Sequence, residues 1–340
     1  MRVTIRDVAK RAGCSISTVS LVLNNRTEKF TPETRERIFK AAADLDYRPN
    51  QLAVSLVKQR SLTLGLVVPD IGNQFFSKLA KEIEEICREH GFNIILCNTN
   101  NDPYIESAQI ALLLDKSVDG FLICMASGSS FADEAKLLKQ IRGRCIPYCI
   151  IDRHYEGVGT YVVAVDHYLG AKLATKALVE AGHRRIACVT GPSHLEDSQA
   201  RLIGYKDVLA ETGIPYDEAL VFQGDYGWQK GRDSAKPLLD AKATAIFAFN
   251  DLSAMGLMSG LHALGLKIPQ DISVIGYDDC DYAQIYDTPL TTIHQPLDLL
   301  GQEAFKLILE QIEGKAKPQV HILIPPYLVK RASVAPCKRG

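Results

Sequence analysis

The sequence predicts an α/β protein with two doubly wound parallel-sheet lobes, preceded by a small N-terminal unit that is entirely α-helical. Apolar runs of strand length alternate with helix-length segments from residue 62 onward. The alternation comes in two successive sets, as expected for two similar lobes. The first 49 residues contain helix signals only. A chain of 340 residues is long enough for two or three domains.

The N-terminal unit contains start signals for three short helices. Thr4 followed by Asp7 resembles a capping box, and Gly13 is expected to end the helix that follows. Ser15 is expected to cap the second helix, and Thr31 with a proline and a glutamate behind it opens the third. Two helices joined by a tight turn that contains glycine form a helix-turn-helix, in which the second helix enters the major groove of DNA.

The face of the second helix supports this interpretation, because it carries the small polar residues Ser15, Ser17, Thr18 and Ser20. Such a face suits close approach to the phosphate backbone and to base edges. The alternative is an ordinary three-helix bundle, since capping signals and amphipathic helices occur in many proteins.

The charge distribution also distinguishes the N-terminal unit from the rest of the chain. Residues 1–60 hold 12 Lys and Arg against 6 Asp and Glu, whereas the remainder holds 27 against 34, which gives about +6 and −7. A basic unit on an acidic body is typical of a protein in which one domain contacts nucleic-acid phosphates. A solvated surface is the alternative explanation of the charge alone.

The cysteines and the N-terminal residues indicate the cellular compartment in which the protein is expected. Nine cysteines are scattered without a CxxC pair or metal-ligand spacing, so we expect reduced thiols and neither a metal nor another cofactor. The chain begins without the apolar run of a signal peptide, and it has no stretch of about 18 apolar residues to span a membrane. The sequence therefore predicts a cytoplasmic protein without a membrane partner.

The run TIRDVAKRAGCSISTVSLVLNN, with YRPN behind it, resembles the DNA-binding head of the lactose/galactose-repressor (LacI/GalR) family of bacterial transcriptional regulators. The resemblance implies a repressor that binds a pseudo-palindromic double-stranded DNA operator as a homodimer. It implies base reading by Ile16, Ser17 and Leu21. Many members have an arginine where Leu21 stands, and leucine offers only apolar contact with a thymine methyl group. The implied DNA-contacting residues are Thr4, Ser15, Ile16, Ser17, Thr18, Leu21, Asn24, Tyr47, Asn50 and Leu56.

The linker at residues 50–61 is rich in helix-favouring residues but too short to be a stable helix by itself in water. In the family, this hinge helix pairs with its twin from the second subunit and a leucine enters the minor groove, a role that matches Leu56 here. The alternative is that Leu52 and Leu56 dock on the body as an ordinary linker helix. The chain carries no added leucine heptad at its end, so we expect a dimer and no tetramer.

The two sets of strands predict where a ligand would bind. The first set is LTLGLVV, NIILCN, DGFLIC and PYCIID, with helices at 76–90 and 104–116, and the second set is VVAV, RIACVT, TAIFAF and ISVIGYD. Ligands of such folds bind beyond the carboxyl ends of the strands, here in a cleft between the lobes.

The resemblance extends over nearly the whole chain, including FNDLSAMG, IPQDISVIGYDD, PLTTIHQP and LVKR. It implies periplasmic-binding-protein-like lobes that the chain crosses three times, near 162, 290 and 325. The expected domains are a helix-turn-helix head at 1–49, a hinge at 50–61, a first lobe at 62–162 plus about 290–325, and a second lobe at 163–289 plus about 326–340.

Side chains near the strand ends are those that a sugar requires, namely aromatic rings for its apolar faces and charged or amide groups for its hydroxyls. Arg201 is expected at the start of a second-lobe helix, and Trp228 is a further aromatic candidate next to Tyr226. Each residue alone could be core or a helix cap, but together they converge on one cleft. The predicted ligand-binding residues, each at a position that contacts ligand in the family, are Asn73, Phe75, Phe76, Asp152, Arg153, Arg201, Tyr226, Asn250, Asp278 and Gln295.

The set of NxFF, Asp-Arg, Arg, Asn, Asp and Gln is similar to that of ribose-binding proteins and ribose repressors, which implies D-ribose as the effector. The alternatives are another pentose, a hexose, a sugar phosphate, a nucleoside, a purine or a phosphorylated carrier protein. An enzyme is not expected, because GxSxG, GxxxxGK[ST], HExxH and a GxGxxG after a strand are absent. A glycosidase that uses Asp152 and Asp278, or a simple sugar carrier, is a distant alternative.

Overall fold

The computed structural model describes residues 3–23, 29–47, 60–155 and 157–337. The chain divides into two compact units, which we call the head (Met1–Leu62) and the body (Thr63–Gly340). Among the described residues, no helix combines the length and the apolar character needed to cross a membrane.

The predicted start signals of the head are confirmed. The Asp7 carboxylate accepts hydrogen bonds from the Thr4 backbone N–H (2.8 Å) and hydroxyl (2.7 Å). Gly13 follows the first helix with a φ of 61°, a left-handed conformation that glycine adopts without steric cost. The hydroxyls of Ser15 and Thr31 accept from backbone N–H groups three residues further on, at 3.1 and 3.4 Å. The three helices are α1 (Ile5–Ala12), α2 (Ile16–Leu23) and α3 (Pro32–Asp44).

The head has its own small core, which holds the helix-turn-helix together. One side chain or more from each helix is buried, and the three helices contact one another pairwise. The buried residues are Val8, Ala9, Ala12, Val19, Val22, Ile38 and Ala41.

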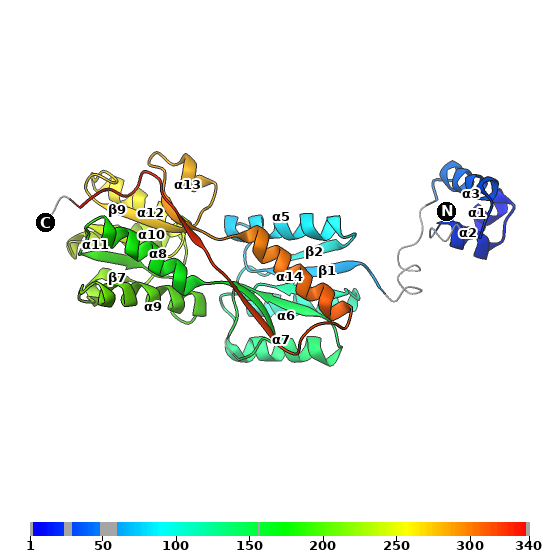
Figure 1. Cartoon of the computed structure of the whole chain (residues 1–340), viewed down its shortest axis with the longest axis horizontal. Helices are drawn as coiled ribbons and strands as arrows, with labels where there is room; N and C mark the ends of the chain where they lie inside the picture. Colours follow the sequence, from blue (N-terminus) through cyan, green and yellow to red (C-terminus); the bar gives the residue numbers. More distant parts are fainter. Residues whose placement is uncertain (1–2, 24–28, 48–59, 156, 338–340) are drawn as a thin grey trace. The chain divides into compact units, whose positions relative to one another are not determined.

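The first lobe of the body is a six-stranded parallel sheet with helices on both faces (Figure 1). Helices α5 and α14 pack on one face, where the core includes Leu79 and Phe305, while α6 and α7 cover the other face. The strand order is β11-β5-β4-β3-β1-β2, the doubly wound arrangement that was predicted. The elements are β1 (Thr63–Val68), α5 (Gln74–Glu89), β2 (Asn93–Asn98), α6 (Pro103–Asp115), β3 (Gly120–Ile123), α7 (Phe131–Gly143), β4 (Tyr148–Ile151), β5 (Tyr161–Val165), α14 (Leu297–Ile312) and β11 (Val320–Ile324).

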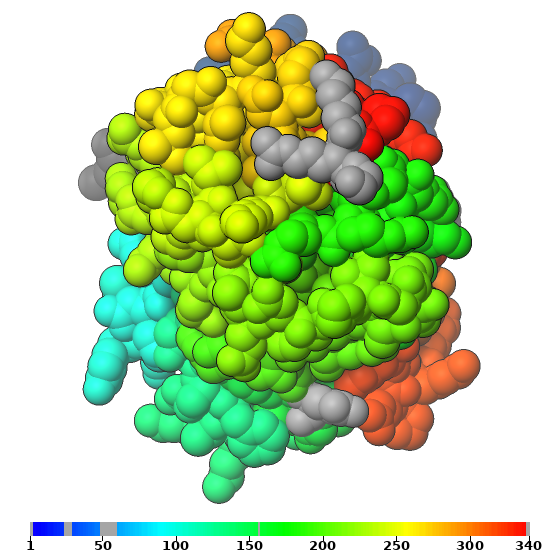
Figure 2. All heavy atoms as spheres, turned by 90° about the vertical axis from the view of Figure 1, so that its left-hand side faces the viewer, coloured from blue at the N-terminus to red at the C-terminus, as the bar shows by residue number. Residues whose placement is uncertain are grey.

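The second lobe repeats this plan with one antiparallel edge strand. Its order is β12-β10-β9-β8-β6-β7, in which β12 runs antiparallel to β10. Figure 2 faces this lobe and shows its outer surface in green and yellow, built from the segments α8 to α12. The elements are α8 (His167–Glu180), β6 (Ile186–Val189), α9 (Glu196–Glu211), η1 (Glu218–Leu220), β7 (Val221–Phe222), α10 (Trp228–Asp233), α11 (Ala235–Asp240), β8 (Ala245–Ala248), α12 (Asp251–Ala263), β9 (Ser273–Asp278), α13 (Tyr282–Ile285), β10 (Thr291–His294) and β12 (Tyr327–Val329).

The crossings between the lobes correct part of the sequence prediction. The run VVAV, placed with the second set of strands, belongs to β5 of the first sheet, where it pairs with β4 on one side and β11 on the other. The first crossing therefore follows Val165 rather than residue 162. Because β10 pairs with β9 in the second sheet, the next crossing lies between His294 and Leu297 rather than near 290. The third lies between Ile324 and Tyr327.

Pairing between strands brings the three crossings together into one hinge between the lobes. We use the word hinge for this region and not for the linker at residues 50–61. β5 pairs with β11 in the first lobe, and β10 pairs with β12 in the second. The Asp166 N–H also donates to the Ile324 carbonyl (2.9 Å), which ties the first crossing to the third. The three chain connections between the lobes thus lie side by side, and the carboxyl ends of both sheets face the space between the lobes.

Candidate ligand cleft and DNA-binding surface

One cavity lies between the carboxyl ends of the two sheets, and all ten predicted ligand-binding residues line it together with Asp197. The free space between its lining atoms is about 290 Å³, which includes the part open to solvent. This is at the small end of the range for ligand pockets. The cavity therefore suits a small molecule and requires the lobes or side chains to move apart slightly.

The first-lobe wall begins where β1 passes into α5. The Asn73 side chain caps α5 by accepting from the Phe75 N–H (3.0 Å), which fixes the first turn. Phe75 and Phe76 are 6% and 2% exposed, and their rings make an edge-to-face pair with centroids 5.0 Å apart. This rigid aromatic pair can cover an apolar face of a ligand.

Asp152 follows β4 directly and is held by the hinge. It is 4% exposed, has a left-handed φ of 63°, and its N–H donates to the Val163 carbonyl (2.9 Å). Its Oδ1 lies 2.9 Å from Nε2 of His167, the first residue of α8. Burial acts to raise the pKa of Asp152, but His167, Arg201 and Arg153 lower it more, so the net pKa lies below its ordinary value.

Arg201 lies in the second turn of α9 rather than at the start of the helix, as the sequence prediction had it. Its guanidinium donates through Nη1 to the Phe249 carbonyl, lies 3.2 Å from Nδ1 of His167, and stacks 3.9 Å above the Tyr277 ring. The tyrosine hydroxyl in turn lies so close to α8 that a Cβ at Gly170 would collide with it. Burial acts to lower the pKa of Arg201, but nearby tyrosines and aspartates raise it above its ordinary value, so the group is a permanent cation.

Arg153 fills much of the space between the two aromatic walls. Its guanidinium lies 5.0 Å from the ring centre of Phe76 in the first lobe and 5.8 Å from that of Tyr226 in the second. It also donates to the Asn101 side chain (3.2 Å). A ligand ring that enters between the aromatics must displace or stack on this cation.

In the second-lobe wall, Tyr226 is held by hydrogen bonds with Asp197 and Asn250. The Tyr226 hydroxyl donates to Oδ2 of Asp197 (2.6 Å), and the Asn250 side chain donates to the Tyr226 carbonyl (3.0 Å). Asn250 also caps α12 by accepting from the Ser253 N–H (3.0 Å). Trp228 does not line the cavity.

Asp278 and Gln295 end neighbouring strands and are joined by a hydrogen bond of 2.7 Å from the amide to the carboxylate. Burial and the nearby Asp251 raise the pKa of Asp278 well above its ordinary value. Burial likewise raises the pKa of Asp251 to about 6. Two buried carboxyls therefore resist ionisation together, and a hydroxyl donor on a ligand would offset part of that cost.

Three buried polar atoms of the lining residues have no hydrogen-bond partner among the described residues, namely Oδ1 of Asp197, Nε of Arg201 and Oε1 of Gln295. Burying such an atom without a partner costs about 1–3 kcal/mol. Two acceptors and one donor on residues that line the cavity therefore lack a partner. They are shielded from water in this conformation, so a polyhydroxylated ligand would satisfy them only as it widens the cavity.

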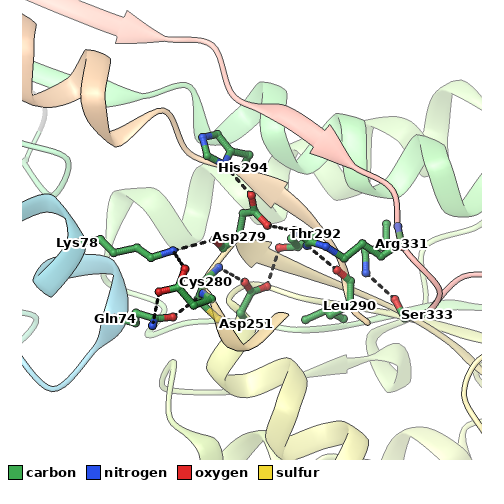
Figure 3. A network of polar contacts seen from close by, with 12 residues as sticks. Gln74, Lys78, Asp251, Asp279, Cys280, Leu290, Thr292, His294, Arg331 and Ser333 are labelled. Atoms are coloured by element: carbon green, nitrogen blue, oxygen red, sulfur yellow. Dashed lines mark hydrogen bonds and ion pairs between the residues drawn. The ribbon is translucent and has the colours of Figure 1, made fainter. Parts of the chain in front are cut away.

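A second set of contacts joins the lobes beside the cavity (Figure 3). Lys78 of α5 pairs with the Asp281 carboxylate (2.7 Å). The Gln74 amide donates to the same carboxylate (3.1 Å) and accepts from the Asp281 N–H (2.7 Å). We call these three residues the rim contact.

The second-lobe half of the rim contact is firmly anchored. In Figure 3, Asp279 lies between His294 and Arg331, which are 2.8 and 2.6 Å from its two oxygens. Burial acts to raise the pKa of Asp279, but these two partners lower it more, so the net pKa is below its ordinary value. The loop from 279 to 281 is thus fixed to the hinge strands.

Sequence reasoning missed two functional candidates, Asp197 and His167. An acid in the first turn of a helix usually complements the helix dipole, which hides any role of Asp197, although its spacing of four residues from Arg201 places both on one helix face. A lone histidine after a strand has no distinguishing signal. Its contacts come from residues 15, 34 and 110 positions away.

In the head, the expected base-reading residues lie on the open side of α2. Ile16 and Leu21 are 45% and 37% exposed, and Ser17 is exposed beside them. Thr4, Ser15 and Thr18 lie at the helix starts, where their polar groups take part in capping, and Tyr47 packs against the edge of the core. Asn24, Asn50 and Leu56 lie outside the described residues.

Two family models match the chain. Residues 4–50 match the model described as bacterial regulatory proteins of the lacI family. Residues 61–332 match the model described as periplasmic binding proteins and sugar binding domain of the LacI family.

Curated relatives match over the full length. The chain is 37% identical over 337 residues to the HTH-type transcriptional regulator DegA of Bacillus subtilis (strain 168), with 99% of each chain covered. It is 36% identical over 335 residues to the HTH-type transcriptional repressor PurR of Vibrio atlanticus (strain LGP32), with 97% of this chain and 98% of the relative covered.

Solved structures agree with the fold. The lac repressor dimer bound to operator and the anti-inducer ONPF gives a TM-score of 0.89 at 28% identity, covering 98% of this chain and 100% of that one. A LacI family transcriptional regulator from Enterococcus faecium with bound ribose gives a TM-score of 0.71 at 37% identity, covering 81% of this chain and 100% of that one.

Proposed function

The chain belongs to the LacI family of bacterial regulatory proteins, as a DNA-binding transcriptional repressor controlled by a small-molecule effector, and we propose that this effector is a monosaccharide, with D-ribose as the first candidate. The observation that carries the proposal is that three residues lining the cavity, Asp197, Arg201 and Gln295, each have a buried polar atom without a partner. A sugar supplies several hydroxyl groups, each able to donate and accept, within a small volume.

The chemistry of the walls favours a neutral sugar over an anion. Asp197 and Asp278 face the cavity, and the raised pKa of Asp278 reflects a site that already resists negative charge. A phosphate group would add charge next to these carboxyls, although Arg153 and Arg201 offset part of it. The edge-to-face pair of Phe75 and Phe76 supplies the apolar surface that a sugar ring requires.

D-ribose is preferred within this class for two reasons. A pentose is smaller than a hexose, so it requires less widening of the narrow cavity. One similar structure, at 37% identity, holds ribose. A purine is the second candidate, because a flat ring could also enter between Phe76 and Tyr226 when Arg153 moves aside.

Isothermal titration calorimetry of the full-length protein tests the proposal, with D-ribose, D-fructose, D-glucose, D-ribose 5-phosphate and hypoxanthine as separate titrants. Saturable heat from D-ribose and none from the others supports both the sugar class and D-ribose, whereas heat from D-fructose or D-glucose alone supports a monosaccharide other than D-ribose. Heat from hypoxanthine or from ribose 5-phosphate alone would replace it with that ligand. The Arg201→Met variant is the matched control, since it should remove the heat of any molecule bound in this cavity.

The proposed mechanism couples this cavity to operator binding by a homodimer. In the proposed mechanism, closure of the cleft shifts the first lobes and withdraws Leu56 of the linker from the minor groove, which lowers operator affinity. A coupling of about 1–3 kcal/mol is enough to change operator occupancy several-fold or more. Binding to DNA selected from a random pool should be weaker for Leu56→Ala, with unchanged effector affinity. Equal DNA affinity would rule out the wedge role.

A further inference from the structure

His167 connects two residues of the proposed effector site without lining the cavity itself. It is the first residue of α8, directly after the first crossing between the lobes, and it is 6% exposed. Its Nε2 lies 2.9 Å from Oδ1 of Asp152 in the first lobe, and its Nδ1 lies 3.2 Å from Nη2 of Arg201 in the second. We call these three residues the buried bridge.

The neighbours of the ring determine which nitrogen carries the hydrogen. A guanidinium has only donors, so Nδ1 of His167 accepts from Arg201 and carries no hydrogen. The Tyr277 hydroxyl, 3.2 Å from the same nitrogen, is a second group that can donate to it. Nε2 then carries the hydrogen and donates to the Asp152 carboxylate. One tautomer and one ring orientation satisfy every contact.

These contacts fix how the two charged groups face the cavity. The Phe249 carbonyl and the Tyr277 ring hold the Arg201 guanidinium on two further sides, while its Nε has no partner. The histidine ring also lies between a carboxylate and a guanidinium that attract each other. Without the ring, the two charges could pair directly, and both would then be less available to hydroxyl groups.

We propose that His167 is a positioning residue, which holds the Asp152 carboxylate and the Arg201 guanidinium in the orientation that receives the hydroxyl groups of the effector. The proposal rests on the proposed function, because it takes the cavity as the effector site. The hinge between the lobes then takes a direct part in effector recognition, because the His167 ring contacts a binding residue of each lobe.

Two conservative variants separate the two arms of the bridge. In His167→Asn the amide lies near the place of Nδ1, so it can accept from Arg201 but does not reach Asp152. In His167→Gln the longer amide reaches Asp152 but leaves Arg201 without its acceptor. His167→Ala removes both arms. By calorimetry with D-ribose, we expect the alanine variant to bind about 10- to 100-fold more weakly and each amide variant to lie between it and the wild type.

His183→Asn is the matched control, because His183 is also a buried histidine of the second lobe, 3% exposed, but contacts Thr244, Ser273 and Ala335 away from the cavity. It should lower the melting temperature without changing D-ribose affinity. The His167 variants should change affinity by more than their melting temperatures account for. Wild-type affinity in His167→Ala or in both amide variants would overturn the proposal.

A second readout does not depend on the effector. In a ¹⁵N spectrum of histidine-labelled wild-type protein, with the His167 signals assigned by their loss in His167→Asn, we expect the neutral ring with hydrogen on Nε2. A hydrogen on Nδ1, alone or in the doubly protonated ring, would overturn the proposal because Arg201 could not then donate to it. If wild-type protein binds no D-ribose, the proposed effector is wrong, and this spectrum decides the role of His167 separately.

Discussion

The buried bridge and the rim contact join the same two lobes in opposite surroundings. In the bridge, the side chains of His167 and Asp152 are 6% and 5% exposed, whereas those of Lys78 and Asp281 in the rim contact are 31% and 61% exposed. An exposed ion pair contributes at most about 1 kcal/mol and is screened by salt, while breaking a buried charged network costs several times more. The bridge can therefore define the geometry of the site, and the rim contact can only adjust how easily the cleft closes.

The largest effect is expected from removing the carboxylate of the buried bridge. Asp152→Ala leaves the His167 N–H without its acceptor and removes a carboxylate that attracts Arg201 and Arg153, at a cost of about 3–5 kcal/mol. D-ribose affinity should fall by about 100-fold or more, and the melting temperature should fall as well. Calorimetry and thermal unfolding measure the two effects. Asp70→Ala, which removes a carboxylate that does not line the cavity, should bind like the wild type.

An intermediate effect is expected where the rim contact is anchored. Asp279→Ala leaves Arg331, 15% exposed, without its carboxylate partner, and should reduce the free energy of unfolding by about 3 kcal/mol at neutral pH. The pKa of Asp279 is lowered in the folded protein, so its stabilisation is present above the ordinary value of 3.8 and is lost as the pH falls through the folded-state pKa. Urea unfolding should show the two proteins converging at acid pH. A constant difference would contradict the role of the charge.

A small effect is expected at the rim contact itself. A double-mutant cycle with Lys78→Ala and Asp281→Ala should give a coupling of about 0.2–1 kcal/mol, and D-ribose affinity should change by less than about fivefold. A coupling as large as that of the buried bridge would mean that exposure is a poor guide to the energetics of these lobes.

The smallest effect is expected from raising the salt concentration, which should change the Lys78–Asp281 coupling energy but not the contribution of the buried bridge to D-ribose affinity. Raising NaCl from about 0.05 M to about 1 M shortens the screening length to about 3 Å and should weaken the Lys78–Asp281 coupling without abolishing it, because the two charged groups are only 2.7 Å apart. The affinity ratio between wild type and His167→Ala should stay constant over the same range. A ratio that falls with salt would show that the bridge is reached by solvent ions.

The sequence was sufficient to predict most of the cleft because its residues occur at the ends of recognisable strands. Asp152, Asp278 and Asn250 each follow an apolar run, and parallel strands bring their carboxyl ends to one edge. The fold class followed from the same alternation. The crossings were harder, since the run VVAV has the composition of a buried strand in either sheet, and only its pairing with β4 and β11 assigns it to the first.

The contacts between the lobes could not be predicted. Gln74 and Asp281 are 207 residues apart, and no local pattern marks either as half of a contact. Strands β10 to β12 are only three to five residues long, too short for a clear alternation of apolar and polar residues. The proposed role of His167 depends on its contacts with two charged side chains, one from each lobe. Only the three-dimensional structure shows these contacts.

A substitution at Gly170 would alter effector specificity without changing any residue that lines the cavity. Gly170 lies one turn after His167 in α8, where any side chain would push against the Tyr277 hydroxyl, and the Tyr277 ring supports Arg201. A larger residue at position 170 would therefore shift the Tyr277 ring and, with it, the Arg201 guanidinium, although Arg201 itself is unchanged. Two similar structures hold different molecules, ONPF and ribose. Substitutions in such supporting positions allow one architecture to drift between ligands in small steps, each of which keeps a functional cleft.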